Sequence, residues 1–366
     1  MIRLVFSSIL VLHGLLHLVG FAKEWDIGSQ GELSGKTFID LSGNGSRIAG
    51  SLWLITGALF LATAVLFLLR REWYWLPAAV GLLISQTLII IYWKDARYGT
   101  FVNIIVFVVV LFAAAAMLFG QAVKREVKLL QSQALKDDKI VTEEMLSALP
   151  QNVQRWLRHT AVAGSKNPNI IRIMQKGSMR SKPGGKWMPF SAVQYFSIDP
   201  PAFVWDARIK VTPFIDIAAR DRYHNGSGHM LIKPMYIFTA ANSSGKEMDQ
   251  GTMLRYLAEM AWFPQAAVSP YLRWEALNDR QSKVTMSYGG IQASGTYSFD
   301  EAGNVTGFEA RRYGDFGGIY RKETWSINVT GYQTFNNRLI GNTSEVTWKL
   351  KEGDFKWLIL EVTAIN

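Results

Sequence analysis

The pattern of hydrophobic residues divides the chain into two parts. Four apolar runs without Asp, Glu, Lys or Arg occupy residues 4–22, 48–69, 73–93 and 101–123. Each has at least 19 residues, and a helix needs about 20 to cross the ~30 Å hydrocarbon core of a bilayer. A buried helix of a soluble protein would normally carry a polar stripe, which these runs lack. The pattern therefore predicts an α-helical transmembrane bundle of four helices.

A cleaved signal peptide is the alternative interpretation of the first run. That run has 19 residues, longer than the apolar core of about 7–15 residues found in signal peptides. It is followed by no small-residue cleavage site and by three further apolar runs. We therefore expect a retained helix.

Beyond about residue 170 the spacing of hydrophobic residues changes from that of a helix to a period of two residues, which is that of a strand. Apolar and polar residues alternate along residues 203–211, 284–288, 291–299, 325–329 and 346–350. Turn-forming clusters of Gly, Asn, Ser and Pro separate these segments, which is typical of antiparallel strands with one solvated face. No strand–helix–strand rhythm is present, so we do not expect a doubly wound parallel sheet. We expect an antiparallel sheet of nine to eleven strands.

Two helical segments accompany the predicted strands. Residues 142–157 show helical spacing interrupted by Pro150. Residues 248–263 form a clearer helix that Pro264 ends. Its predicted buried face, at i, i+3, i+4 and i+7, consists of Met253, Tyr256, Leu257 and Met260. We expect this helix to cover the apolar side of a curved sheet, giving an α+β fold.

These patterns predict three regions. Residues 1–123 form the transmembrane domain, 124–141 a basic linker, and 142–366 a soluble, mainly antiparallel β domain.

The distribution of charged residues predicts how the chain is oriented in the membrane and which kind of partner it binds. One set of membrane flanks carries Arg3, Arg70, Arg71, Lys124, Arg125 and Lys128, with Lys136 and Lys139 further on; the opposite set carries Lys23, Lys36, Arg47, Lys94 and Arg97. The small excess places both termini and the β domain in the cytoplasm, at the inner membrane. From residue 150 onward there are 26 Lys and Arg against 18 Asp and Glu, which favours an anionic lipid surface as partner. These basic residues are dispersed and form no nucleic-acid motif, so no nucleic-acid partner is expected.

Composition removes several kinds of chemistry. The chain of 366 residues contains no cysteine, which excludes disulfides, thiolate metal sites and a catalytic thiol. It also lacks a G-x-S-x-G elbow, a P-loop, an H-E-x-x-H motif and a dinucleotide-binding glycine pattern. No cofactor and no metal are therefore predicted.

Polar residues in or beside the apolar runs form one candidate cluster: His13, His17, Gln86, Asp95 and Asn103. His13 and His17 share a helix face and are compatible with a metal or haem ligand pair, a proton relay, or hydrogen bonds between helices. We favour hydrogen bonds, because no carboxylate lies at membrane depth to complete a metal site. The segment around Gln86, Asp95 and Asn103 is compatible with a substrate site or with a structural turn and capped helix ends, and we favour the turn.

The β domain carries a second set of candidates. Asp221, His224 and His229 flank a predicted hairpin turn, and with Glu259 they are compatible with acid–base or metal chemistry. Arg255 and Glu259 are either a solvated i, i+4 pair or part of a pocket beside Trp262. The sequence leaves these alternatives open.

Several motifs resemble an uncharacterised bacterial domain family. Residues 255–264 read RYLAEMAWFP, residues 221–230 read DRYHNGSGHM, and Arg312-Tyr313 follows later. With the segment opening at Val153 and the strand at Trp205, they resemble a family that is recognised by an RYLAExxWFP signature. The resemblance covers roughly residues 145–366, and the apolar front end is similar to the membrane bundle of some members. The family has no settled activity, and its strand pattern is similar to the curved-sheet lipoprotein-carrier fold.

The leading hypothesis is a polytopic membrane protein of which the β domain binds a lipid, a fatty-acid-like molecule or another apolar ligand. Trp187, Trp205, Trp262 and Phe263 would line the cavity, with Asp221, Glu259 and Tyr313 beside them, and Arg255 and Arg312 would hold an anionic head group. The alternatives are a membrane-associated enzyme that uses Asp221, His224, His229 and Glu259, and a scaffold of which the sheet pairs with another protein.

Overall fold

The computed structural model describes residues 2–28, 33–34, 36–41, 43–135, 139–164, 166–212 and 215–366. The chain folds into two compact units, Met1–Phe119 and Gly120–Asn366. Part of the predicted basic linker, residues 136–138 with Lys136, lies outside the described residues.

The helices of the described chain are α1 (Ile2–Glu24), α2 (Asn44–Leu68), α3 (Trp75–Ile91), α4 (Trp93–Ala96), α5 (Gly99–Gln133), α6 (Glu143–Ser147), α7 (Gln151–His159) and α8 (Lys246–Glu259), with two 3₁₀ helices, η1 (Met260–Trp262) and η2 (Pro264–Val268). The division between the two units falls within α5.

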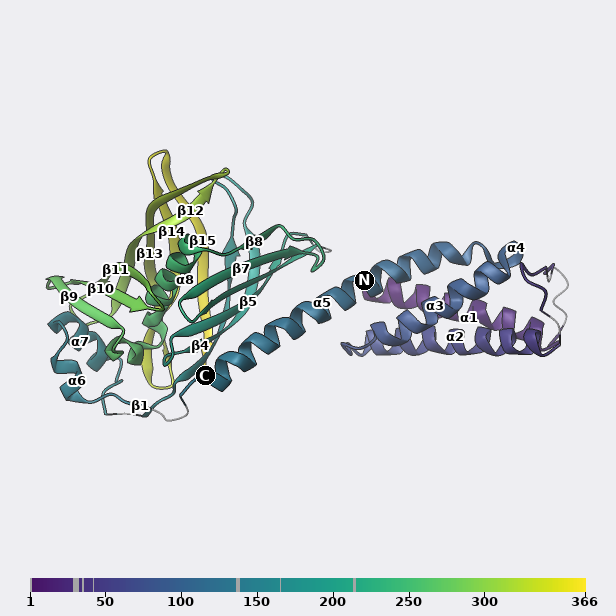
Figure 1. Cartoon of the computed structure of the whole chain (residues 1–366), viewed down its shortest axis with the longest axis horizontal. Helices are drawn as coiled ribbons and strands as arrows, with labels where there is room; N and C mark the ends of the chain where they lie inside the picture. Colours follow the sequence, from purple (N-terminus) through teal and green to yellow (C-terminus); the bar gives the residue numbers. More distant parts are fainter. Residues whose placement is uncertain are drawn as a thin grey trace. The chain divides into compact units, whose positions relative to one another are not determined.

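The helical unit contains α1, α2, α3, α4 and the first part of α5 (Figure 1). Within the described residues, three helices are long and apolar enough to cross a membrane: α1, α2 and α5. Helix α3 is as apolar but has only 17 residues, or about 26 Å at the usual helical rise. The prediction of four membrane-crossing helices is thus confirmed in part: three helices are long enough to cross, and the fourth is shorter.

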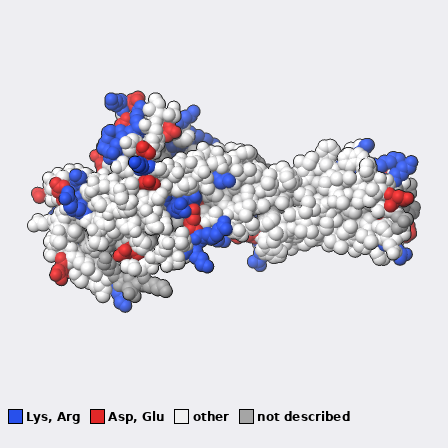
Figure 2. Space-filling view, viewed as in Figure 1, with Lys and Arg blue, Asp and Glu red and all other residues white. Residues whose placement is uncertain are grey.

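The surface of the helical unit is strongly apolar. Large side chains such as Leu16, Leu83 and Phe101 are 65%, 71% and 68% exposed. On the face drawn in Figure 2, charged residues lie at the ends of this unit and leave its middle uncharged. Such a continuous apolar surface is far larger than the patches on soluble proteins, so the helical unit is suited to a membrane.

The strands are β1 (Lys139–Ile140), β2 (Lys166–Asn167), β3 (Ile170–Met179), β4 (Met188–Ser197), β5 (Ala202–Lys210), β6 (Asp216–His224), β7 (Ser227–Pro234), β8 (Ala241–Ser243), β9 (Leu272–Asn278), β10 (Gln281–Tyr288), β11 (Ile291–Phe299), β12 (Val305–Phe316), β13 (Ile319–Phe335), β14 (Arg338–Leu350) and β15 (Gly353–Ile365).

In the described part of the second unit, β3 to β15 form one antiparallel sheet in the order 8-7-6-5-4-3-15-14-13-12-11-10-9. Two meanders, β3–β8 and β9–β15, meet where β3 pairs with β15. The sheet has thirteen strands, so the predicted number of nine to eleven was wrong. Edge strand β8 has only three residues, too few for a period of two to be read from the sequence.

Helix α8 connects the two meanders and lies within the curve of the sheet (Figure 1). It contacts β6 and β7 of the first meander and β10, β11 and β12 of the second. The predicted buried face is confirmed, because Met253, Tyr256, Leu257 and Met260 are all fully buried. The α-helix ends earlier than predicted, at Glu259, and continues as η1; Pro264 does not end it but begins η2.

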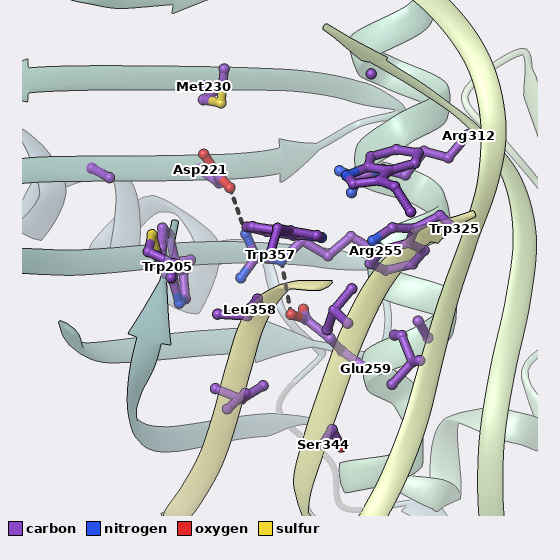
Figure 3. A pocket seen from close by; sticks show the side chains of 18 of the residues that line it. Trp205, Asp221, Met230, Arg255, Glu259, Arg312, Trp325, Ser344, Trp357 and Leu358 are labelled. Carbon is purple, nitrogen blue, oxygen red and sulfur yellow. Dashed lines mark hydrogen bonds and ion pairs between the residues drawn. The ribbon is translucent and has the colours of Figure 1, made fainter. Parts of the chain in front are cut away.

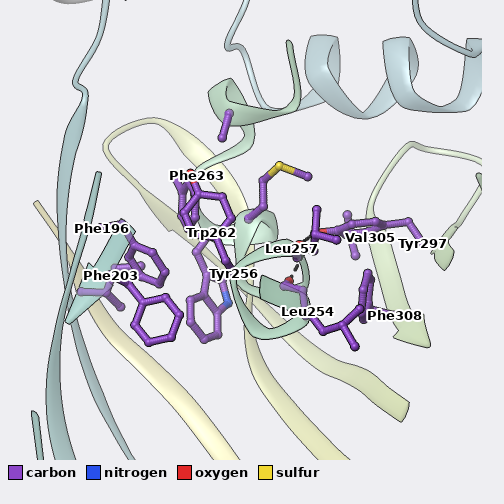
Figure 4. Packing of buried hydrophobic residues seen from close by; sticks show 14 of the residues in the cluster. Phe196, Phe203, Leu254, Tyr256, Leu257, Trp262, Phe263, Tyr297, Val305 and Phe308 are labelled. Atoms are coloured by element: carbon purple, nitrogen blue, oxygen red, sulfur yellow. Dashed lines mark hydrogen bonds between the residues drawn. The ribbon is translucent and has the colours of Figure 1, made fainter. Parts of the chain in front are cut away.

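The core of the β unit packs around α8 (Figure 4). Tyr256 and Phe263 contact Phe196 of β4, with ring centroids 6.2 and 4.5 Å away. On the other side, the Tyr297 hydroxyl donates to the Leu257 carbonyl at 2.5 Å. Helix α8 is therefore held by aromatic packing from both meanders.

Two hairpin turns meet at one end of the sheet. Gly226 of the β6–β7 turn and Gly289 of the β10–β11 turn are so close that a Cβ on Gly226 would lie 2.8 Å from the α-carbon of Gly289. Both glycines also have positive φ, 79° and 60°. This contact brings the two meanders together and leaves the sheet curled around α8.

Candidate functional site

The concave face of the sheet and one side of α8 enclose a cavity of about 790 Å³ (Figure 3). Most of its wall is aromatic or aliphatic, including Trp205, Trp262, Trp325, Trp348 and Trp357. Small-molecule pockets have volumes of about 300–1,000 Å³ and are mostly apolar with a few polar groups. The cavity has the size and character of a ligand site.

Arg255 of α8 is the centre of an ion-pair cluster in the cavity wall. Its Nη1 donates to Asp221 of β6 at 2.5 Å, and its Nε donates to Glu259 at 2.8 Å. The guanidinium also lies 4.6 Å from the Trp205 ring centroid. Burial opposes the charge of Arg255, but the charges of Glu259 and Asp221 outweigh it and raise the pKa of Arg255. Arg255 is thus a permanent cation with two carboxylate partners.

Glu259 is held from its other side by an amide chain. Gln194 of β4 donates to Glu259 at 2.7 Å, Gln175 of β3 donates to Gln194 at 2.9 Å, and the Trp205 Nε1 donates to Gln175 at 2.8 Å. Burial raises the pKa of Glu259, although Arg255 and Gln194 oppose that rise. The chain fixes this side of the cavity, and its polar groups are largely satisfied within the protein.

Arg312 of β12 also lines the cavity, but its environment is different. Its guanidinium lies 4.7 Å from the centroid of the Trp325 ring on β13. Within the described residues Arg312 forms no ion pair and its buried Nε has no hydrogen-bond partner. Burial, and then the charge of Arg255, lower the pKa of Arg312 to about 10, so at neutral pH it is still a cation.

Two indole groups near Arg312 in the cavity wall are also unpartnered. The buried Nε1 atoms of Trp325 and Trp357 have no hydrogen-bond acceptor among the described residues. A buried donor without a partner costs about 1–3 kcal/mol. Arg312, Trp325 and Trp357 therefore line one cavity, and each has a buried donor without a hydrogen-bond partner among the described residues.

Most residues predicted for the site line this cavity. They are Trp205, Asp221, Arg255, Glu259, Trp262, Arg312 and Tyr313. Two predicted residues do not: Phe263 packs in the core behind it, and Trp187 lies under Arg180, with its ring centroid 4.7 Å from the guanidinium. For Arg255 and Glu259, the structure favours the pocket over the solvated pair, because both are largely buried at its wall.

The predicted acid–base group is not brought together. Asp221 pairs with Met230 across β6 and β7, and both line the cavity. His229 pairs with Arg222 in the alternate register and lies on the opposite face, as does His224. His224 hydrogen-bonds Gln133 of α5, while Arg220 and Arg222 bind Glu126 at 3.1 and 3.3 Å. His224 thus belongs to the contact with the end of α5, and His229 lies on the same face of the sheet.

The sequence analysis missed several residues of the site. Gln175, Gln194, Trp325 and Trp357 all come from strands, and none belongs to a local motif. The alternation of apolar and polar residues along 325–329 predicts that Trp325 faces one side of the sheet. It does not predict that this side lines a cavity.

In the helical unit, four of the five predicted cluster residues form a hydrogen-bonded network. His13 contacts Asn103 at 2.9 Å, and His17 contacts Ser85 at 2.9 Å. Asn103 in turn donates to Ser85 and to Gln86, both at 3.0 Å. The network joins α1, α3 and α5. Asp95 lies apart from it, 3.8 Å from the Lys23 ammonium.

Metal ligands do not gather in the parts of the chain that the structure describes: no group of three His, Cys, Asp or Glu side chains is placed to hold an ion.

Comparisons with known proteins give a family and weak structural likenesses. A comparison with curated proteins finds no match. Among solved structures, a DUF1329 family protein from Desulfovibrio piger is 9% identical, with 60% of this chain and 92% of that chain covered and a TM-score of 0.29. A LolA superfamily protein from Nitrosomonas europaea is 6% identical, with 62% and 93% covered and a TM-score of 0.31. The model of a family of unknown function, DUF6544, matches residues 139–360. That match confirms the expected membership in an uncharacterised domain family, and the chain belongs to DUF6544.

Proposed function

We propose that this chain is a multi-pass membrane protein of which the β unit binds an amphiphile: an apolar chain with an anionic, acceptor-bearing head group. The observation that carries the proposal is the set of free donors in the aromatic cavity, namely Arg312 Nε, Trp325 Nε1 and Trp357 Nε1.

The polar part of the cavity selects the head group. A carboxylate or phosphate oxygen would satisfy donors that have no acceptor in the described protein. Guanidinium forms forked hydrogen bonds with either group, and charged hydrogen bonds are about twice as strong as neutral ones. Arg312 is the better anchor than Arg255, because Asp221 and Glu259 already neutralise Arg255.

The apolar part of the cavity selects the rest of the ligand. Indole and phenyl rings of Trp262, Trp348 and Phe355 line the cavity. Hydrocarbon buried there gains about 25 cal/mol per Å² removed from water. A single acyl chain fits this character.

The membrane arrangement is a second part of the proposal. In this proposal helix α3 is the fourth membrane-crossing helix. About 17 residues is the lower limit for a helix that crosses a bilayer, and the Trp and Tyr residues at the ends of α3 extend its apolar length. The basic flanks then place the β unit on the cytoplasmic side of the inner membrane. Because the chain has no cysteine, single Cys replacements at Ser147 and at Ser34, an exposed residue between α1 and α2, would test sidedness by labelling intact cells. Ser147 should be protected and Ser34 labelled.

Ligand binding is tested with the full chain, stripped of lipid in detergent and examined by native mass spectrometry with palmitate and with phosphatidylglycerol. We expect at least one of them to bind, and 1-hexadecanol to bind more weakly. Arg312→Gln should lower the affinity by roughly 10–100-fold, the value of one charged hydrogen bond of about 1.5–3 kcal/mol.

Arg311→Gln is the matched control. Arg311 is the preceding residue, is exposed, and binds the Lys322 carbonyl outside the cavity, so its loss should leave binding unchanged. Failure of both ligands to bind the stripped wild-type chain, or equal losses in the two variants, would contradict the proposal.

A further inference from the structure

The helical unit contains a second cavity, separate from the amphiphile site. It has a volume of about 280 Å³ and is lined by residues of α1, α2, α3, α4 and the start of α5. His13, His17, Trp53, Tyr92 and Tyr98 give it largely aromatic walls. An apolar cavity of about 150 Å³ is sufficient to bind benzene, so this one has room for a substituted ring.

Four buried polar atoms at the cavity residues have no hydrogen-bond partner in the described chain. Three are nitrogens, His13 Nδ1, Lys23 Nζ and Trp53 Nε1, and the fourth is the Tyr92 hydroxyl oxygen. His13 is 3% exposed and Trp53 is 6% exposed. Unpaired polar atoms are rare in folded proteins. Four of them at one cavity indicate that something polar completes the site.

The surrounding network fixes what each atom can offer. His13 Nε2 lies 2.9 Å from the Asn103 oxygen. The contacts of Asn103 with Ser85 and Gln86 assign this atom as the amide oxygen, which accepts a hydrogen bond. His13 Nε2 therefore carries the ring proton. His13 Nδ1 is then a free acceptor. Trp53 Nε1 and Lys23 Nζ are free donors.

The charges at the cavity, one cation and two carboxylates, disfavour an anion, and the two donors Trp53 Nε1 and Lys23 Nζ require an acceptor rather than a cation. Lys23 is 3.8 Å from Asp95 and Glu24 also lines the cavity, so the positive charge of Lys23 is already offset. Aromatic rings stack on planar ligands. A ligand that satisfies the three nitrogens has a hydroxyl for His13 and an oxygen acceptor for Trp53 and Lys23.

We infer that this cavity is a binding site for a small, neutral, single-ring aromatic molecule with a hydroxyl and a carbonyl oxygen. The site is independent of the amphiphile cavity, which lies in the other unit.

The test uses the full chain in lipid nanodiscs, labelled with 5-fluorotryptophan and followed by ¹⁹F NMR. The Trp53 signal is assigned with Trp53→Phe. The probe is 4-hydroxyacetophenone, which carries both oxygen groups, and toluene is the matched ring without them. We expect a saturable shift of the Trp53 signal with the probe, with at least tenfold weaker binding of toluene. Signals of Trp325 and Trp357 should not move in step with it, which separates this result from binding at the amphiphile site.

Two variants, Gly99→Ala and Lys23→Met, should weaken binding, and a third, Ser7→Ala, is the control for a change in α1 outside the cavity. Gly99→Ala places a methyl group 3.6 Å from His13 Cε1, and its closest contact, 2.8 Å, is with the flexible end of Ile89; it should reduce the shift at least tenfold. Lys23→Met should weaken binding by removing one donor. Ser7→Ala changes another buried, unpartnered atom on α1 that does not line the cavity, and it should bind like wild type.

A cavity that holds only water would give no saturable shift, and that result would overturn the inference. Equal responses to 4-hydroxyacetophenone and toluene, or full binding by both Gly99→Ala and Lys23→Met, would also overturn it. The signals of Trp73 and Trp93, which belong to the helical unit but do not line the cavity, report whether this unit is folded in each variant.

Discussion

Arg255 and Arg312 line the same cavity, yet within the described residues only Arg255 has carboxylate partners. Arg255 comes from the helix in the centre of the unit and Arg312 from a strand of the second meander. The first is therefore part of the frame of the cavity, and the second is available to a ligand. The two arginines should respond differently to removal.

Arg255→Met is expected to destabilise the β unit. It would leave Asp221 and Glu259 buried without their cation, and breaking a buried pair from one side costs about 3–5 kcal/mol. Hydrogen exchange of the full chain, resolved by peptide, should show faster exchange in α8 and β6. Adding Asp221→Asn and Glu259→Gln should restore much of the protection, while Arg158→Met, in an exposed pair with Glu143, should change little.

Gly226→Ala is expected to cost more than Gly184→Ala. Both glycines have positive φ, 79° and 68°, so both substitutions carry the left-handed backbone penalty of about 1–2 kcal/mol. Only at Gly226 would the new Cβ also meet the Gly289 backbone, which adds an overpacking cost of about 1–3 kcal/mol. Melting temperatures of the two variants compare them directly. Equal losses would mean that the contact between the two turns is unimportant.

Glu126→Gln should loosen the contact between the end of α5 and β6. Glu126 binds Arg220, of which the side chain is only 7% exposed, and Arg222. Removing its charge leaves a buried guanidinium unpaired, so exchange of the β6 and β7 amides should accelerate. Glu361→Gln, in the exposed pair with Lys176, is the control and should leave these amides unchanged.

Stability of the β unit should fall as the pH falls. Burial and then the nearby charge of Arg222 lower the pKa of His224; burial, Arg220 and Arg222 lower the pKa of His229, with Glu126 and Asn242 opposing. Below the ordinary value of 6.5 the unfolded chain takes up protons that the folded one does not. The melting temperature should therefore decrease between about pH 7.5 and 5.5.

The histidine pair is tested by replacing both. His224→Gln with His229→Gln should reduce this pH dependence, whereas His159→Gln, at an exposed position of α7, should not. A slope that stays the same in the double variant would assign the effect to other groups.

Features that depend on residues close together in the sequence were predicted, and features that depend on distant residues were not. Apolar runs and the period-two alternation are local, so β5 and β11 were found within one residue of their ends. The helical spacing of residues 248–263 predicted α8, while the sequence left open whether Arg255 and Glu259 are solvated or line a pocket; both line the cavity. Where the pairing is not local, prediction failed. The sequence did not show that Asp221 and His229 lie on opposite faces of the sheet, because a turn that allows either register hides which residues pair.

Trp325 and Trp357 illustrate the same limit for the site itself. They lie on β13 and β15, and both reach the cavity only because the sheet curls around α8. Their unpartnered indoles are visible only once every neighbour is placed. Curvature is a property of the whole sheet and has no counterpart in a short stretch of sequence.

The pairing of β3 with β15 determines how the β unit can be made. During synthesis the first meander leaves the ribosome with β3 as an open edge, and its partner β15 emerges only after β4 to β14. Contacts of such large sequence separation form slowly, and an unpaired edge invites association with other chains. The edge of β3 therefore stays open until β15 is made and pairs with it, and removal of β15 would divide the sheet in its middle.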